Sequence, residues 1–164
     1  MRYLTNRTFD EIARGDRAAL TRTLKREDIA LFATVSGDIN PAHLDEEFAA
    51  HDIFHHIVAH GMWGGALISA LLGTSLPGPG TIYLSQTLRF RRPVAIGDTV
   101  TAAVVVREKQ EAKAHVVFDC AVTNQADEVV IDGEAVVIAP REKISRPAPH
   151  LPHVAVIEDA AGTP

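Results

Sequence analysis

One stretch limits the fold more than any other: the seventeen residues from His60 to Leu76, HGMWGGALISALLGTSL, contain no Asp, Glu, Lys or Arg. A helix needs about 20 apolar residues to cross a bilayer, so this stretch is too short for a membrane span. A helix that is apolar around its whole circumference is instead buried inside a protein. Glycines at positions 61, 64 and 65 weaken a helix, which indicates that other segments pack closely against it. The stretch therefore predicts a central helix that is buried on all sides.

The sequence after this helix has the pattern of β-strands. Four segments are rich in strand-favouring residues, and turn-forming residues separate them. Short connections between long strands are typical of antiparallel hairpins. An alternating segment upstream of the helix indicates a fifth strand. We therefore predict an α+β fold in which an antiparallel β-sheet wraps around a long central helix. The predicted strands are Ala19–Lys25, Thr81–Phe90, Asp98–Glu108, Ala114–Thr123 and Val129–Ile138.

Composition predicts an ordinary soluble domain in the cytoplasm. Of the 164 residues, 23% are charged and 46% are hydrophobic, as in most globular proteins. The net charge of −5 argues against a nucleic-acid partner, and neither a signal peptide nor a membrane span is expected. Cys120 is the only cysteine, so it has no partner for an internal disulfide. We expect one domain over residues 1–140, followed by an extended or mobile proline-rich tail over 141–164.

A short polar stretch, SGDINPAHLD from Ser36 to Asp45, lies between apolar segments. A helix is predicted from Arg26 to this point, with Gly37 ending it, and Asn40 followed by Pro41 is typical of a new helix start. That second helix, HLDEEFAA, is expected to end before His51. Asp38, Asn40 and His43 can be explained by turn and cap formation alone. They can equally be explained as an acid–base pair, because a carboxylate beside an imidazole can activate a water molecule. The local pattern leaves both interpretations open.

The start of the central helix is a second candidate site. A backbone N–H at a helix N-terminus, such as that of Gly61, can stabilise an oxyanion, although a lone glycine is more often only a tight entry to a helix. Ser69 lies within the helix, where a serine usually bonds to its own preceding turn. Four histidines, at 51, 55, 56 and 60, do not have the spacing of a metal-binding motif, and no cysteine joins them. We therefore expect no metal site.

With these segments identified, the chain resembles the MaoC-like (R)-specific enoyl-CoA hydratases of the hot-dog fold, over about Phe32 to Ile138. The main motif is D-x-N-P-x-H, here Asp38 to His43. A second, IVAHGM, stands at Ile57–Met62 ahead of the central helix. Further matching segments are ALISALLG, LPGPGTIYLSQTLRF, RPVAIGDTV and DGEAVV.

The resemblance implies roles for individual residues. The family's catalytic pair corresponds to Asp38 and His43, and its oxyanion donor to the N–H of Gly61. The motif asparagine, Asn40, supports the pair, and the pocket serine corresponds to Ser69. The family also implies a homodimer that acts on acyl-CoA. We expect no metal and no cofactor apart from the coenzyme A of the substrate, because the thioester already acidifies the α position.

Two positions depart from the family pattern. His56 stands where members often have proline, and Trp63 stands where they often have an aliphatic residue. Trp63 is expected either to shorten the acyl pocket or to fill the core.

The implied reaction is the reversible addition of water to trans-2-enoyl-CoA, which gives (R)-3-hydroxyacyl-CoA. Alternatives are a dehydratase for 3-hydroxyacyl groups on acyl-carrier protein, a hot-dog acyl-CoA thioesterase, and a module that binds acyl-CoA without catalysis. The D-x-N-P-x-H motif argues against the thioesterase. The intact Asp38/His43 pair argues against the module.

Overall fold

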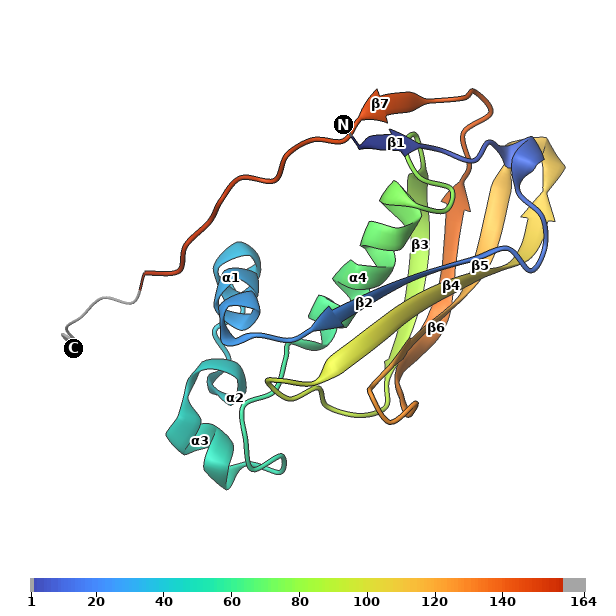
Figure 1. Ribbon diagram of the computed structural model, residues 1–164. Helices are drawn as coiled ribbons and strands as arrows, with labels where there is room; N and C mark the ends of the chain where they lie inside the picture. Colours follow the sequence, from blue (N-terminus) through green and yellow to red (C-terminus); the bar gives the residue numbers. More distant parts are fainter. Residues whose placement is uncertain (1, 158–164) are drawn as a thin grey trace.

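The fold is a curved antiparallel sheet with one helix along its inner face (Figure 1). The computed structural model describes residues 2–157. The main sheet has five strands, in the spatial order β2-β4-β5-β6-β3. This is the predicted arrangement, and the strand boundaries differ from the predicted ones by at most two residues. The strands are β2 (Arg17–Thr23), β3 (Ile82–Phe90), β4 (Thr99–Gln110), β5 (His115–Thr123) and β6 (Val129–Ile138).

The strand order makes β2 and β3 the two edges of the sheet. Strands β4, β5 and β6 form consecutive hairpins, while β3 pairs with β6 rather than with its neighbour in sequence. Gly133 on β6 makes this pairing possible, because a Cβ there would lie 1.9 Å from the carbonyl oxygen of Thr87 on β3. The glycine therefore permits a close approach of two backbones, as glycines in strands often do.

Helix α4 (Gly61–Thr74) is the predicted central helix, but it is not buried on all sides. Its apolar side chains that face the sheet are buried, and these are Trp63, Leu67, Ile68, Leu71 and Leu72. The opposite face, which includes Met62 and Ser69, is exposed. The prediction of complete burial is wrong for the described chain, because the sheet of one chain covers one side of the helix only. The inference from the glycines is correct, since a Cβ on Gly64 would lie 2.3 Å from Cδ1 of Ile131.

The segment before α4 contains three short helices. Helix α1 (Arg26–Ser36) ends at Gly37, whose φ of 76° is the left-handed conformation that glycine adopts easily. Helix α2 (Pro41–Leu44) starts at Asn40 as predicted. The single helix predicted over residues 43–50 is wrong, because the chain breaks at Asp45 and restarts as α3 (Glu46–His51). The Asp45 side chain accepts a hydrogen bond from the N–H of Phe48, which makes it a helix cap rather than an interior residue.

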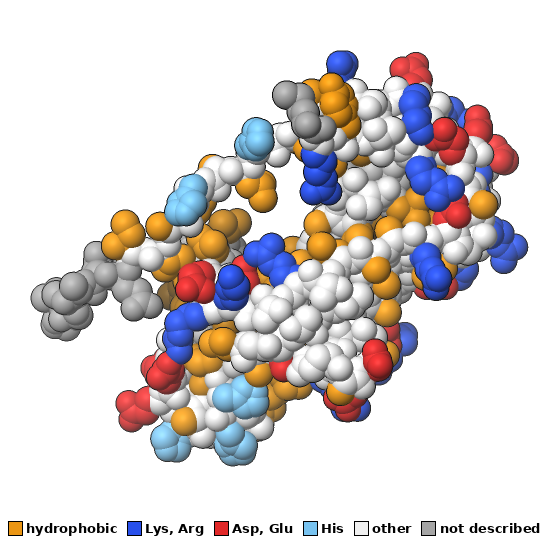
Figure 2. All heavy atoms as spheres, viewed as in Figure 1, with side chains coloured by type: hydrophobic (Ala, Val, Ile, Leu, Met, Phe, Trp, Pro, Cys, Tyr) orange, Lys and Arg blue, Asp and Glu red, His pale blue; other side chains and the backbone are white. Residues whose placement is uncertain are grey.

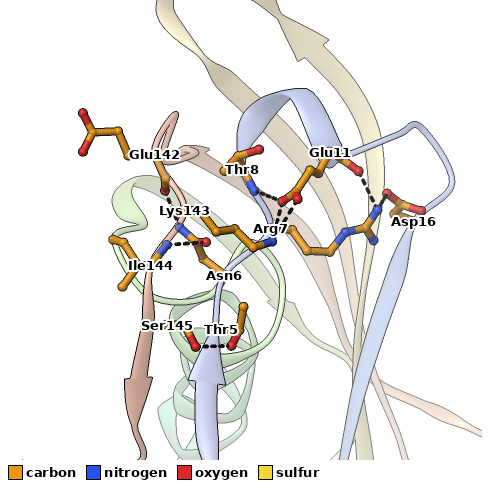
Figure 3. A network of polar contacts seen from close by, with 10 residues as sticks. All are labelled: Thr5, Asn6, Arg7, Thr8, Glu11, Asp16, Glu142, Lys143, Ile144 and Ser145. Carbon is orange, nitrogen blue, oxygen red and sulfur yellow. Dashed lines mark hydrogen bonds and ion pairs between the residues drawn. The ribbon is translucent and has the colours of Figure 1, made fainter.

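The first strand, β1 (Tyr3–Thr5), pairs with the last, β7 (Ser145–Pro147), as a separate two-stranded sheet. Figure 3 shows the polar contacts that hold these segments together. The buried Asn6 side chain bonds to backbone groups of Glu142 and Ile144. Residues 145–147 thus form a strand that lies against the N-terminal segment, and the division into a domain over 1–140 and a tail stays a prediction. Of the predicted tail, residues 158–164 lie outside the described part of the chain.

Two 3₁₀ turns complete the described structure, η1 (Phe9–Glu11) and η2 (Glu111–Lys113). On the face in Figure 2, Lys and Arg side chains lie close to Asp and Glu side chains rather than in a basic patch of their own. Among the ion pairs, Arg107 contacts both Asp119 and Glu134. Between residues 2 and 157, none of the helices has the length and apolar character needed to cross a membrane.

Candidate active site

The loop after α1 is tied down by its own polar groups. The N–H of Asp38 donates to Oγ of Ser36 at 3.1 Å, and the Asp38 carboxylate accepts from the N–H of Asn40 at 3.2 Å. Oδ1 of Asn40 in turn accepts a hydrogen bond from the N–H of Ala42, which lies in the first turn of α2. Asn40 therefore links the loop to α2 through both its main chain and its side chain. The polar stretch thus does form turns and a helix cap, as the first of its two interpretations predicts.

The same turn brings His43 beside Asp38. Nδ1 of His43 lies 2.8 Å from the carbonyl oxygen of Val58. A carbonyl oxygen can only accept, so Nδ1 must carry the proton and a neutral ring has its free lone pair on Nε2. One side-chain ligand atom from each of Asp38, His43 and His60 falls within 4.8 Å of the other two. The structure thus places a carboxylate and an imidazole of defined tautomer side by side, which is the arrangement that general acid–base catalysis requires.

His60 is a third member of this cluster, and its role was not predicted from the sequence. It is 2% exposed, it stands at the N-cap position of α4 without a side-chain capping bond, and its Nε2 lies 2.9 Å from the main-chain carbonyl oxygen of Asp38. Its ring centroid is 3.9 Å from that of His43. From the sequence, His60 was considered only as a possible metal ligand. Its place directly before Gly61, in the second motif, was the signal that could have drawn attention to it.

A cavity of about 600 Å³ opens beside these three side chains. Asp38, His43 and His60 lie on its wall together with Gly61, and much of the remaining lining is apolar. The apolar part includes Trp63, Phe90, Val94 and Ile131. A mostly apolar cavity with a few convergent polar groups is the usual form of a small-molecule site.

Gly61 begins α4, so its N–H is among the first four of the helix, which have no partner within it. A Cβ at this position would lie 2.8 Å from the ring of Phe90, which explains why a glycine fits here. The position of Gly61 on the cavity wall is compatible with a donor to an oxyanion, and that role stays a prediction.

The other predicted residues differ in their placement. Trp63 is 7% exposed and belongs both to the core and to the cavity wall, so the two interpretations of this residue are not exclusive. Ser69 lies on the exposed face of α4 and is not among the residues that line this cavity in the described chain. Its role in a pocket remains a prediction.

The four histidines do not form a metal site together. His51 and His55 bond through Nδ1 to main-chain carbonyls of α3, namely those of Glu47 and Ala50. Within residues 2–157, the group with metal-ligand proximity is Asp38, His43 and His60. One nitrogen of each ring in that group is already bonded to a carbonyl. The two rings are tilted, with an angle of 33° between their planes. Ligand atoms of the three side chains lie within 4.8 Å of one another, so the absence of a metal stays a prediction.

The only thiol of the chain is a poor nucleophile. Cys120 on β5 is 3% exposed, and burial raises its pKa to about 11, so the thiolate is scarce at neutral pH. Burial likewise raises the pKa of Tyr83 on β3 to about 12. Neither side chain is set up to react through its ionised form.

Known proteins match this chain over most of its length. Residues 9–129 match the family model of the MaoC like domain. The (R)-specific enoyl-CoA hydratase of Rhodospirillum rubrum is 48% identical over 132 residues, which cover 80% of this chain and 91% of that protein. The 3-hydroxybutyryl-CoA dehydratase of Methylorubrum extorquens is 44% identical over 141 residues, which cover 85% of this chain and 88% of that protein.

The solved structures include one that is similar throughout. The unliganded R-hydratase PhaJ1 from Pseudomonas aeruginosa superposes with a TM-score of 0.90 and is 46% identical. The match covers 94% of this chain and 99% of that one. The D-x-N-P-x-H motif, the cavity at the start of α4 and these matches lead to one conclusion: the chain belongs to the MaoC like domain family, with the hot-dog fold.

Proposed function

We propose that the protein is an (R)-specific enoyl-CoA hydratase, which adds water reversibly to trans-2-enoyl-CoA to give (R)-3-hydroxyacyl-CoA. The observation that carries the proposal is the pairing of Asp38 with a His43 ring whose Nε2 is free, on the wall of a largely apolar cavity. The similarity to hydratases and a dehydratase of CoA thioesters over most of the chain supports the same reaction.

In this proposal the chemistry follows from the residue types. A water molecule held by Asp38 and His43 attacks C3 of the enoyl group, and one of the two side chains takes its proton. The electrons of the C2=C3 bond move toward the thioester carbonyl, where the N–H of Gly61 stabilises the negative charge. A proton then returns from the pair to C2. The hydroxyl group of the water is now on C3 and a proton is on C2, and both side chains have returned to their starting protonation states.

We propose that this reaction uses no metal and no cofactor, because coenzyme A is part of the substrate and the thioester already activates the double bond. Treatment with EDTA is therefore expected to leave the hydration rate unchanged. A loss of activity that added zinc restores would contradict this mechanism.

We also propose that the protein works as a homodimer in the cytoplasm. Strand β3 is an edge of the sheet, and it exposes three apolar side chains, Ile82, Leu84 and Phe90. The exposed face of α4 carries a fourth, Met62. A second copy that pairs along β3 would cover the apolar side chains of that strand. The lone, buried Cys120 is in keeping with a reducing compartment.

The decisive experiment follows the absorbance of crotonyl-CoA with purified protein and then determines the chirality of the 3-hydroxybutyryl-CoA formed. We expect the enoyl absorbance to fall and the (R)-product to form, with Asp38→Asn as the inactive control. Release of free coenzyme A would instead support the thioesterase. A reaction confined to crotonyl-acyl-carrier protein would support the dehydratase for carrier-bound substrates. Binding of crotonyl-CoA without turnover would support the binding module.

A further inference from the structure

The environment of His60 is unusual for a core residue. The side chain is 2% exposed and lies against two other rings, with centroid distances of 3.9 Å to His43 and 5.0 Å to Phe32. Its Nε2 is 2.9 Å from the carbonyl oxygen of Asp38. Since that oxygen only accepts, Nε2 must be the protonated nitrogen.

The other ring nitrogen of His60 is left without a partner. Nδ1 is buried and makes no hydrogen bond with any of the residues that the structure describes. A buried polar atom in this state is costly, and such atoms are uncommon in native structures. A phenylalanine would fill the same volume without this cost. The histidine therefore needs an explanation beyond packing, and its contacts to Asp38 and His43 offer one.

We propose that His60 is a positioning residue for the acid–base pair. Its Nε2–H holds the main chain of Asp38, while its ring supports the plane of the His43 imidazole. One side chain thereby contacts both members of the pair and limits their separation. Val58 completes the arrangement from two residues before His60, because its carbonyl fixes Nδ1 of His43. The inference rests on the proposed hydration activity, in which Asp38 and His43 act on the same water.

The expected effect is on the chemical step. A misplacement of a catalytic group by about 1 Å can cost about 100-fold in rate. Removing the Nε2–H from His60 is therefore expected to lower kcat by about 10- to 100-fold. KM should change much less, because the apolar wall of the cavity stays in place. A merely structural histidine would behave differently, since replacing it with an aromatic hydrocarbon would remove the unpartnered nitrogen and leave turnover intact.

The test compares two variants of the full chain in crotonyl-CoA hydration. His60→Phe keeps a ring but loses the donor, and His60→Gln places an amide N–H where Nε2 stood. We expect the Phe variant to lose the activity stated above while its melting temperature is unchanged or higher. The Gln variant should recover a substantial part of kcat. His56→Phe, at an exposed histidine nearby, is the matched control and should behave as the wild type.

A double-mutant cycle shows whether His60 acts through the pair. In a His43→Ala background, His60→Phe should cost little further, because Asp38 and His43 act on the same water and the pair no longer works once His43 is gone. A full additional loss in that background would overturn the inference. So would wild-type kcat in His60→Phe, or failure of both His60 variants to fold. Absence of hydration in the wild-type protein would instead refute the proposed function itself.

Discussion

At the scale of single residues, the site depends on which nitrogen of each histidine carries a proton. The carbonyls of Val58 and Asp38 each face one ring nitrogen, and this determines the tautomers of His43 and His60 without any charged partner. The backbone around His43 therefore determines that the free lone pair of its ring lies on Nε2. The two carbonyls come from segments about twenty residues apart, so the tautomers depend on the fold as a whole.

Loss of either side chain of the proposed catalytic pair should abolish most of the activity and leave the fold intact. We expect Asp38→Asn and His43→Ala each to lower kcat by about 10²- to 10⁴-fold, the usual contribution of a positioned acid or base. Asp38 is exposed and His43 is only partly buried, so the melting temperature should change little. Steady-state hydration of crotonyl-CoA measures the effect. A variant that keeps more than half of the wild-type kcat would refute the role of that residue.

Trp63 should determine which acyl chains fit. Its indole lies on the cavity wall, where an aliphatic residue would leave more room. We expect Trp63→Leu to raise kcat/KM for an enoyl-CoA of eight or more carbons relative to crotonyl-CoA. Each additional buried methylene contributes roughly 0.8 kcal/mol. An equal change for both substrates, or a loss of stability alone, would mean that Trp63 serves only the core.

At the scale of elements, α4 combines two kinds of packing along one helix. Its glycine at position 64 faces the sheet, where Ile131 leaves no room for a side chain, whereas Gly73 has open space around its Cβ position. Both residues lie within the helix, so both should gain helix propensity from alanine. Alanine substitutions at positions 64 and 73 therefore separate the effect of packing on stability from the effect of helix propensity.

The matched substitutions are expected to change stability in opposite directions. Gly64→Ala should destabilise the protein by about 1–3 kcal/mol, the usual cost of overpacking a core. Gly73→Ala should stabilise it by up to about 1 kcal/mol. Urea unfolding of both variants measures the difference. If Gly64→Ala is as stable as the wild type, the contact with Ile131 is easily relieved and the close packing has no energetic weight.

Local patterns were enough to predict most elements. The helix start at Arg26, the stop at Gly37 and the four long strands follow from caps and periodicity, which act over a few residues. The break at Asp45 was missed because its capping bond competes with a continuous helical pattern. β1 and β7 were missed because they are short and pair across about 140 residues. No pattern within either segment indicates the other.

The candidate site shows the same limit. The proximity of Asp38 and His43 could be predicted from the motif, because one short turn contains both. The contact from His60 to the Asp38 carbonyl could not, since the two residues are 22 positions apart and meet only when α4 lies against the sheet. The exposed face of α4 was also beyond prediction, because residue type alone does not indicate how much of a helix one sheet covers.

At the scale of the whole molecule, polar contacts join the two ends of the described chain. Lys143 bonds to the carboxylate of Glu11, and Arg7 pairs with Asp16 (Figure 3). The bond to Lys143 and the N–H of Thr8 lower the pKa of Glu11 from its ordinary 4.5. The N–H of Ala13 and the pairing with Arg7 lower the pKa of Asp16 in the same way. The native state therefore keeps both carboxylates charged at a pH where the unfolded chain takes up protons.

These shifts predict how stability depends on pH. A lowered carboxyl pKa contributes stability above the unfolded value, and this contribution is lost as pH falls through the folded value. We expect Lys143→Met to reduce the free energy of unfolding at pH 7, and we expect the difference from wild type to shrink toward pH 3. Denaturant unfolding at several pH values measures it, with Lys113→Met as the control. A difference that persists unchanged at pH 3 would contradict the role of Glu11.

Phe90 connects the outer edge of the sheet to the interior of the cavity. It lies on the edge strand β3, it is 53% exposed, and its ring is the group that a Cβ on Gly61 would strike. A molecule bound against Phe90 at the end of β3 would therefore contact a wall of the cavity. With a second copy in that place, turnover per protein molecule would depend on how concentrated the protein is. Diluting the protein would then lower its activity per molecule, although no small molecule has been added.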